Sequence, residues 1–117
     1  MTSAPEVVDR LIDAVERRDV RGIAECFDLE AQSSQWSVPA IVSGRGDIEL
    51  MYEQLLRTHP EIAVRIVQRL TVGEVVVDHE EISGYSHLAA GTVVNKVYVY
   101  TVRDGRIVTM TGFNAST

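Results

Sequence analysis

The chain has 117 residues, enough for one compact domain, and 45% of them are hydrophobic, with three prolines and eight glycines. This composition excludes the disordered and repetitive classes of protein and predicts one folded domain over residues 1–117. The net charge of −6 and the scattering of the eleven Lys and Arg residues oppose binding to a phosphate backbone, so we expect no nucleic-acid partner.

The first residues, MTSAPEVVDRL, contain neither a basic leader nor an apolar stretch of signal-peptide length, and the purely apolar runs elsewhere are short. We therefore expect a cytoplasmic protein without a membrane partner. Cys26 is the only cysteine. This excludes an internal disulfide and a cysteine-based metal cluster, and it suits a reducing compartment.

The amino-terminal part of the chain has helical spacing. Ser3 and Glu6 have the spacing of a capping box, and an apolar stripe from Val8 to Val15 follows with the 3.6-residue period of a helix. Asp19 can cap a short second helix that continues through Phe27. Two consecutive helices are therefore predicted.

The pattern then becomes irregular, and it predicts a short strand near residues 33–38 with a turn at Pro39. A third helix begins near Gly46 and carries apolar residues on one face, from Ile48 to Leu55. It ends before Pro60, because the residue that precedes a proline disfavours helical geometry.

Beyond Pro60 the apolar period changes from 3.6 to 2. Apolar residues at 62, 64, 66, 70 and 72 alternate with polar ones, which predicts a long strand with one buried face. Three more strands are predicted over residues 75–83, 93–102 and 106–113. The pair Asp104-Gly105 between the last two is a strong hairpin signal.

Helices followed by a meander of long antiparallel strands indicate the α+β class rather than a doubly wound parallel sheet. A strongly bent antiparallel sheet that wraps around the three helices of the amino-terminal half would form a cone with one open end. Such a cone has room for an enclosed pocket.

At this point the chain resembles the nuclear transport factor 2-like superfamily, which includes SnoaL-like polyketide cyclases, ketosteroid isomerases and limonene epoxide hydrolases. The resemblance covers nearly the whole chain and rests on four segments: VVDRLIDAVERRDVRGIAECF, WSVPAIVSGRGDIELMYEQL, VVVDHEEISG and VYVYTVRDGRIVTMTGF. It implies a SnoaL-like, cystatin-like cone that binds a small molecule, and a homodimer formed through the outer face of the sheet.

The catalytic sets of two members are not matched. The proton-shuttling aspartate of ketosteroid isomerases falls on Gln35, the oxyanion-hole tyrosine on Leu11 and its aspartic acid partner on Tyr98, which can still donate a hydrogen bond. The arginine and two aspartates of the epoxide hydrolases fall near Glu80, Ile82 and Gly112. The resemblance therefore predicts the cone without either familiar reaction.

The run VVVDHEEISGY, residues 75–85, carries four consecutive ionisable side chains on a predicted strand. Alternation places His79 and Glu81 on one face and Asp78 and Glu80 on the other, and the pattern alone leaves open which face is inward. The register of the family places His79 and Glu81 inward.

These two side chains are close enough on a strand to form a hydrogen bond, which would poise the imidazole for proton transfer near neutral pH. We expect His79 to act as base, Glu81 to orient it, and Tyr98 to donate to an oxyanion. Four further residues are expected to line the ligand site, namely Gln35, Trp36, Met110 and Asn114.

The favoured function is isomerase, dehydratase or cyclase chemistry on a small apolar organic substrate, with no cofactor and no metal. The alternative is a binding or dimerisation module without catalytic activity, in which His79 and Glu81 form a satisfied polar pair. The two hypotheses differ in whether these side chains face a cavity.

Overall fold

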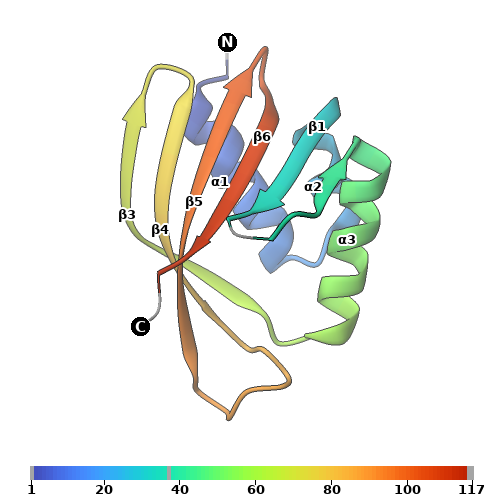
Figure 1. The fold of residues 1–117 in the computed structure, drawn as a ribbon, viewed down its shortest axis with the longest axis vertical. Coiled ribbons are helices and arrows are strands. Elements are labelled where there is room, and N and C mark those ends of the chain that lie inside the picture. Colours follow the sequence, from blue (N-terminus) through green and yellow to red (C-terminus); the bar gives the residue numbers. More distant parts are fainter. Residues whose placement is uncertain (1, 37, 116–117) are drawn as a thin grey trace.

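The computed structural model describes residues 2–36 and 38–115. Figure 1 shows how the described residues form helices on one side of a curved sheet, which confirms the α+β class predicted from the sequence. The elements in chain order are α1 (Ala4–Glu16), α2 (Val20–Glu25), β1 (Phe27–Gln35), β2 (Ile41–Ser43), α3 (Arg45–Thr58), β3 (Ala63–Val72), β4 (Val75–Ser83), β5 (Val93–Arg103) and β6 (Arg106–Asn114).

The helix starts are set by local hydrogen bonds. The hydroxyl of Ser3 accepts from the backbone N–H of Glu6, whose carboxylate accepts from the N–H of Ser3, so the predicted capping box is confirmed. Asp19 accepts from the N–H of Gly22 at 3.0 Å and caps α2. Helix α2 ends at Glu25, so the prediction that it includes Phe27 is wrong. Phe27 is buried as the first residue of β1.

The predicted strand over 33–38 begins earlier than expected, because β1 extends from Phe27 to Gln35. Residue 37 lies outside the described residues. Strand β2 was not predicted: its three residues pair only with β1 and are too few to show alternation. The hairpin at Asp104-Gly105 is confirmed, since both residues have positive φ, as a two-residue hairpin turn of this kind requires.

The strands form one sheet in the order β2-β1-β6-β5-β4-β3. The predicted antiparallel meander is confirmed for β3 to β6, which follow one another in space as in sequence. The pair β1 and β6 is parallel, and it joins segments from opposite ends of the chain. This pair extends the sheet toward α3 and thereby widens the concave side.

Strand β3 contains a bulge, because Ile66 pairs with Glu80 and Gln68 pairs with His79, which leaves Val67 as an extra residue. An extra residue reverses the alternation beyond it. The prediction of one buried face along this strand is therefore wrong for its second half: Leu70 is 62% exposed and Val72 is 66% exposed.

The core lies between the helices and the concave side of the sheet. Helix α1 packs on β3 to β6, and α3 packs on β1, β2 and α2. The largest fully buried apolar side chains are Val7, Val8, Leu11, Ile23, Phe27, Ile48, Ile62, Val76 and Ile107. No helix of the described residues covers the convex face of the sheet, as Figure 1 shows.

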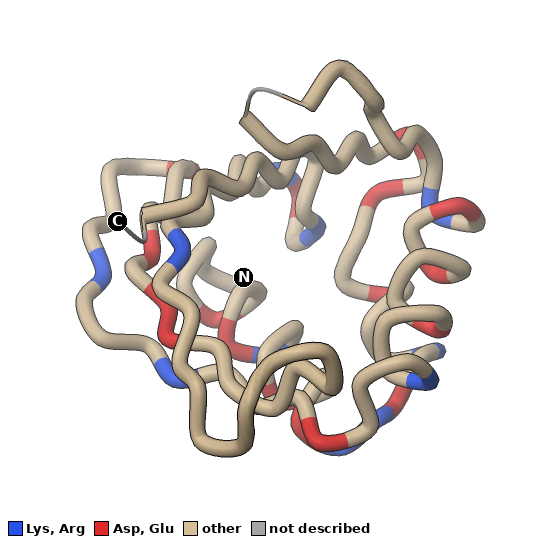
Figure 2. Tube along the Cα trace, turned by 60° about the horizontal axis from the view of Figure 1, so that its bottom comes forward, with Lys and Arg blue, Asp and Glu red and all other residues tan. Residues whose placement is uncertain are grey.

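The charged residues are distributed around the fold. Figure 2 shows Lys and Arg interspersed with Asp and Glu on the helices and strands, with no element dominated by basic residues. Among the described residues, no helix is both long and apolar enough to cross a bilayer.

Candidate functional site

A cavity lies between the helices and the concave face of the sheet, and it has two adjoining compartments. The inner one has a volume of about 60 Å³ and the outer one about 320 Å³. Four residues line both compartments: Tyr52, Leu55, Tyr85 and Tyr98. An apolar cavity of about 150 Å³ accommodates benzene, so the outer compartment has the size for a two-ring compound.

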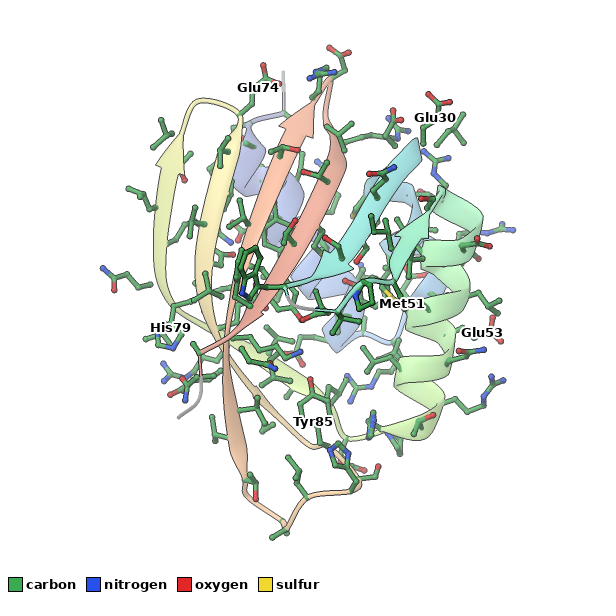
Figure 3. All side chains as sticks on the ribbon, in the orientation of Figure 1. Glu30, Met51, Glu53, Glu74, His79 and Tyr85 are labelled. Carbon is green, nitrogen blue, oxygen red and sulfur yellow. The ribbon has the colours of Figure 1, made fainter. Side chains whose placement is uncertain are left out.

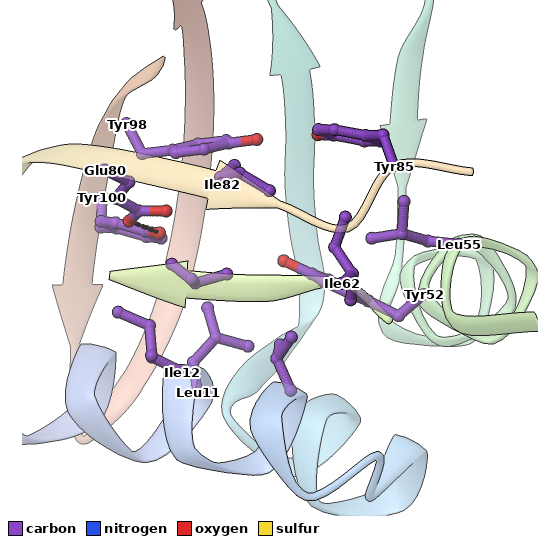
Figure 4. Close-up of a pocket in the computed structure, with 12 residues that line it drawn as sticks. Leu11, Ile12, Tyr52, Leu55, Ile62, Glu80, Ile82, Tyr85, Tyr98 and Tyr100 are labelled. Atoms are coloured by element: carbon purple, nitrogen blue, oxygen red, sulfur yellow. Dashed lines mark hydrogen bonds between the residues drawn. The ribbon is translucent and has the colours of Figure 1, made fainter. Parts of the chain in front are cut away.

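Glu80 is the carboxyl group of the inner compartment (Figure 4), and it is 3% exposed. Its Oε2 accepts a hydrogen bond from the hydroxyl of Tyr100 at 2.8 Å. Burial raises the pKa of Glu80 to about 7, an effect to which the charge of Asp78 adds and which the hydrogen bond from Tyr100 opposes. Near neutral pH Glu80 is therefore present in both protonation states. A group that first takes up a proton and then returns it needs both states.

Asp78 lies on the same inward face of β4 and is completely buried. Arg69 binds both of its carboxylate oxygens, at 2.7 and 2.9 Å, and also binds Asp9 of α1 at 2.7 Å. The bulge in β3 makes this arrangement possible, because it brings Arg69 opposite Asp78 on the inner face. Arg69 thus provides Asp78 with hydrogen-bond partners and a counter-charge, and Glu80 is the acidic side chain among the described residues that line the cavity.

Tyrosine hydroxyls supply the other polar groups of the inner compartment. Tyr98 and Tyr100 stack on one another from β5, and Tyr52 extends from α3 (Figure 4). Burial raises the pKa of Tyr98 above its ordinary value, so its hydroxyl remains protonated and able to donate a hydrogen bond. Ala in place of Gly112 would bring its Cβ within 2.8 Å of the Tyr98 ring, so Gly112 leaves room for this tyrosine.

The structure corrects the predicted orientation of β4. Asp78 and Glu80 face inward, and His79 and Glu81 lie on the outer face. His79 Nε2 is 2.8 Å from Asn95 Oδ1, and Glu81 pairs with Arg65. Figure 3 places His79 on the margin of the sheet away from α3. The proposed pair of His79 and Glu81 is therefore not formed, and the catalytic roles that depended on it are withdrawn.

Only some of the other predicted site residues line the cavity. Gln35, Tyr98 and Met110 line the outer compartment. Trp36 is 70% exposed and stacks on Phe113, outside the cavity. Asn114 is exposed at the end of β6 and is not part of either lining. Gln35, Tyr98 and Met110 thus lie on the cavity wall, and Trp36 and Asn114 do not; that any of them binds a ligand stays a prediction.

Sequence reasoning did not assign roles to Glu80, Tyr100, Tyr85 or Lys96, all of which line the cavity. The register of β4 and β5 pairs Asp78 with Tyr98 and Glu80 with Lys96. Paired residues point to the same face, so an inward Tyr98 requires an inward Asp78 and Glu80. This pairing would have predicted that Glu80 faces the cavity. It could not be read from the sequence, because the long connection between β4 and β5 does not fix their register.

Comparisons with known proteins agree with this architecture. A family profile described as a SnoaL-like domain matches residues 8–110. A cystatin-fold protein from Novosphingobium aromaticivorans matches with a TM-score of 0.84 and 16% identity, over 96% of this chain and 98% of that one. A search among curated proteins found no match.

Two further solved structures are similar. A protein from Catenulispora acidiphila with a ketosteroid isomerase-like fold, in complex with trimethylamine, has a TM-score of 0.82 and 16% identity, covering 92% of this chain and 84% of that one. A proposed polyketide cyclase from Sinorhizobium meliloti has a TM-score of 0.79 and 20% identity, covering 92% and 94%. At these identities the likeness shows the fold.

Proposed function

Because the chain belongs to the SnoaL-like domain family, we propose that it binds a small, largely apolar organic molecule and performs acid-base chemistry on it without a cofactor. The observation that carries the proposal is Glu80, a buried carboxyl group with a pKa of about 7 on the wall of a mainly apolar cavity. Perturbed titratable groups in a cavity are frequent among catalytic acids and bases.

The proposed reaction begins at a carbon atom next to a carbonyl group of the ligand. The carboxylate of Glu80 takes a proton from this carbon, so that the C–H bond breaks, an O–H bond forms on Glu80, and the electron pair moves to the carbonyl oxygen as an enolate. Tyr98 donates a hydrogen bond to that oxygen, because its hydroxyl remains protonated. Glu80 then returns the proton to the same or a different carbon, which is the proton transfer that an isomerisation or a cyclisation needs.

Tyr100 has a positioning role in this proposal. Its hydroxyl donates to one oxygen of Glu80 at 2.8 Å and holds the carboxyl group toward the cavity. Burial raises the pKa of Tyr100 well above its ordinary value, so it does not compete with Glu80 as an acid near neutral pH.

The test uses 2-tetralone, an apolar two-ring ketone, as a probe of proton abstraction. The purified protein should accelerate exchange of the protons next to the carbonyl for deuterium in D₂O, measured by NMR against buffer alone. We expect Glu80→Gln to reduce the protein-catalysed rate by about 100-fold, which is within the usual range for a general base. The rate of the wild-type protein should rise with pH and level off above about pH 7, as Glu80 ionises.

Glu81→Gln is the matched control, because it removes a carboxylate from the adjacent position of the same strand on the outer face. Its exchange rate should equal that of the wild-type protein. If 2-tetralone binds but its exchange is no faster than in buffer, the alternative of a binding module without catalytic activity is the better description. Equal rates for the wild type and Glu80→Gln would exclude Glu80 as the base.

We also propose that a second copy of the chain covers the convex face of the sheet. Support comes from the side chains on this face: Val77 of β4 lies beside Val97 and Val99 of the neighbouring strand β5, and Leu70 of β3 is largely exposed next to Val77. No described helix covers this face. Burial of such apolar surface favours association.

A further inference from the structure

Lys96 is the only lysine in the sequence, since the other ten basic residues are arginines. It lies on the inner face of β5, opposite Glu80 of β4 and Asn114 of β6. Its side chain lines the outer compartment, and its ammonium nitrogen is 5.9 Å from the centre of the Tyr98 ring. The single lysine of the chain is therefore directed at the candidate ligand site.

Within the described residues, no carboxylate lies within 4.0 Å of Lys96 to form an ion pair. Burial lowers the pKa of Lys96, and the charge of Glu80 offsets this only in part. Glu80 is itself close to half protonated at neutral pH, so it supplies an incomplete counter-charge. Removing a cation from water without a full counter-charge costs free energy, and an anion that enters the cavity would lower that cost.

The rest of the outer compartment is mainly apolar. Its wall contains Val38, Ala40, Val42, Met51, Leu55 and Met110, which come from α3, β2, β6 and the segment before β2. Lys96 is the one cationic side chain among the residues that line either compartment in the described part of the chain. A single ammonium group is a compact point charge, which matches the one negative charge of a carboxylate.

We propose that the natural ligand is an amphipathic carboxylate, with its carboxylate bound by Lys96 in the outer compartment and its apolar skeleton directed toward Glu80. This inference rests on the proposed function, because it assigns the substrate class of the same cavity. The inner compartment, of about 60 Å³, has room for only a small group such as a carbonyl. The carboxylate thus anchors one end of the ligand while the reacting carbon lies near Glu80.

The test compares two ligands of the same shape, 2-naphthoate and the neutral 2-naphthamide, by isothermal titration calorimetry at pH 7.5. The wild-type protein should bind 2-naphthoate at least about tenfold more tightly than 2-naphthamide. Lys96→Met should remove this preference and leave binding of 2-naphthamide unchanged, which also shows that the variant is folded. Arg103→Met, which removes an exposed cation from the end of the same strand, should behave as the wild type.

A preference for 2-naphthoate that persists in Lys96→Met, or equal binding of the two ligands by the wild type, would overturn the carboxylate inference and leave the proposed function intact. If neither ligand binds the wild type, both the inference and the apolar binding site of the proposed function are wrong. A preference that Arg103→Met also abolishes would mean that net charge, rather than Lys96, attracts the anion, and it too would overturn the inference.

Discussion

At the scale of single residues, the site depends on which face of β4 is buried. The run Asp78 to Glu81 offers two pairs of ionisable side chains, and the fold buries Asp78 and Glu80. The two buried groups have different partners: Arg69 neutralises Asp78 with two hydrogen bonds, whereas Glu80 receives one hydrogen bond from a neutral tyrosine. Adjacent carboxyl groups on one face thus acquire different properties from their partners.

The raised pKa of Glu80 makes a prediction about stability. Its pKa rises from an ordinary value of 4.5 to about 7 in the folded protein, so between these pH values the folded state binds the proton more tightly than the unfolded state. The stability that this group contributes is fully present below pH 4.5 and is lost as the pH rises through 7. The loss is about 3 kcal/mol.

We therefore expect Glu80→Gln, which cannot ionise, to be about as stable as the wild type at pH 4.5 and more stable than it by about 3 kcal/mol at pH 8. Urea unfolding at the two pH values gives the free energy of unfolding of both proteins. The contributions of the other titrating groups are the same in both and cancel in the difference. A difference that does not change with pH would show that Glu80 ionises normally in the folded protein.

At the scale of the elements, irregular positions in the strands and connections determine where the site residues lie. The bulge at Val67 reverses the alternation of β3 and brings Arg69 to the inner face. Gly84 ends β4 at a place where its backbone contacts that of Glu61, just before β3, and it has a φ of 88°. This close approach holds the start of the connection that carries Tyr85 to the cavity.

Gly84 and Gly73 form a matched pair for a test of this contact, because both have positive φ but only Gly84 is crowded. An added Cβ at Gly84 would lie 2.0 Å from the carbonyl oxygen of Glu61, whereas nothing lies within 4 Å of one at Gly73. We expect Gly84→Ala to lower the free energy of unfolding by about 4 kcal/mol. Gly73→Ala should lower it by only about 1 kcal/mol, from backbone strain. Thermal and urea unfolding measure both, and equal losses would contradict the proposed contact.

At the scale of the whole molecule, the helices and the sheet leave two different apolar surfaces. The helices cover the concave face of the sheet and form the cavity together with it, while no described helix covers the convex face. The cavity binds ligand in our proposal and the convex face binds a second copy of the chain. The two surfaces are opposite sides of the same strands, so each substitution on β4 or β5 affects mainly one of them.

Val99 lies near the middle of the convex face, between Val77 and Thr111. In the proposed dimer, Val99→Glu would bury a charge in an apolar interface, and we expect it to weaken association by about 30-fold or more, equivalent to about 2 kcal/mol. Sedimentation equilibrium measures the effect. Leu50→Glu, at an exposed position of helix α3, is the control and should leave the mass unchanged. A wild-type protein that is monomeric at all concentrations would contradict the proposal.

The sequence by itself determined the elements whose causes are local. The capping box at Ser3, the cap at Asp19, the end of α3 before Pro60 and the turn at Asp104-Gly105 depend on neighbouring residues, and each is found where it was predicted. The family pattern likewise indicated the cone, and two residues that it singled out, Gln35 and Tyr98, line the cavity.

Only the tertiary structure decided which side chains enter the cavity. Alternation gives two equivalent faces, and the choice between them depends on pairing with another strand across a connection whose length does not determine the register. A shift of one residue therefore separates the predicted pair, His79 and Glu81, from the pair that is buried, Asp78 and Glu80. The burial of β4 against α1 and its pairing with Tyr98 and Lys96 make that choice, because both depend on residues far away in the sequence.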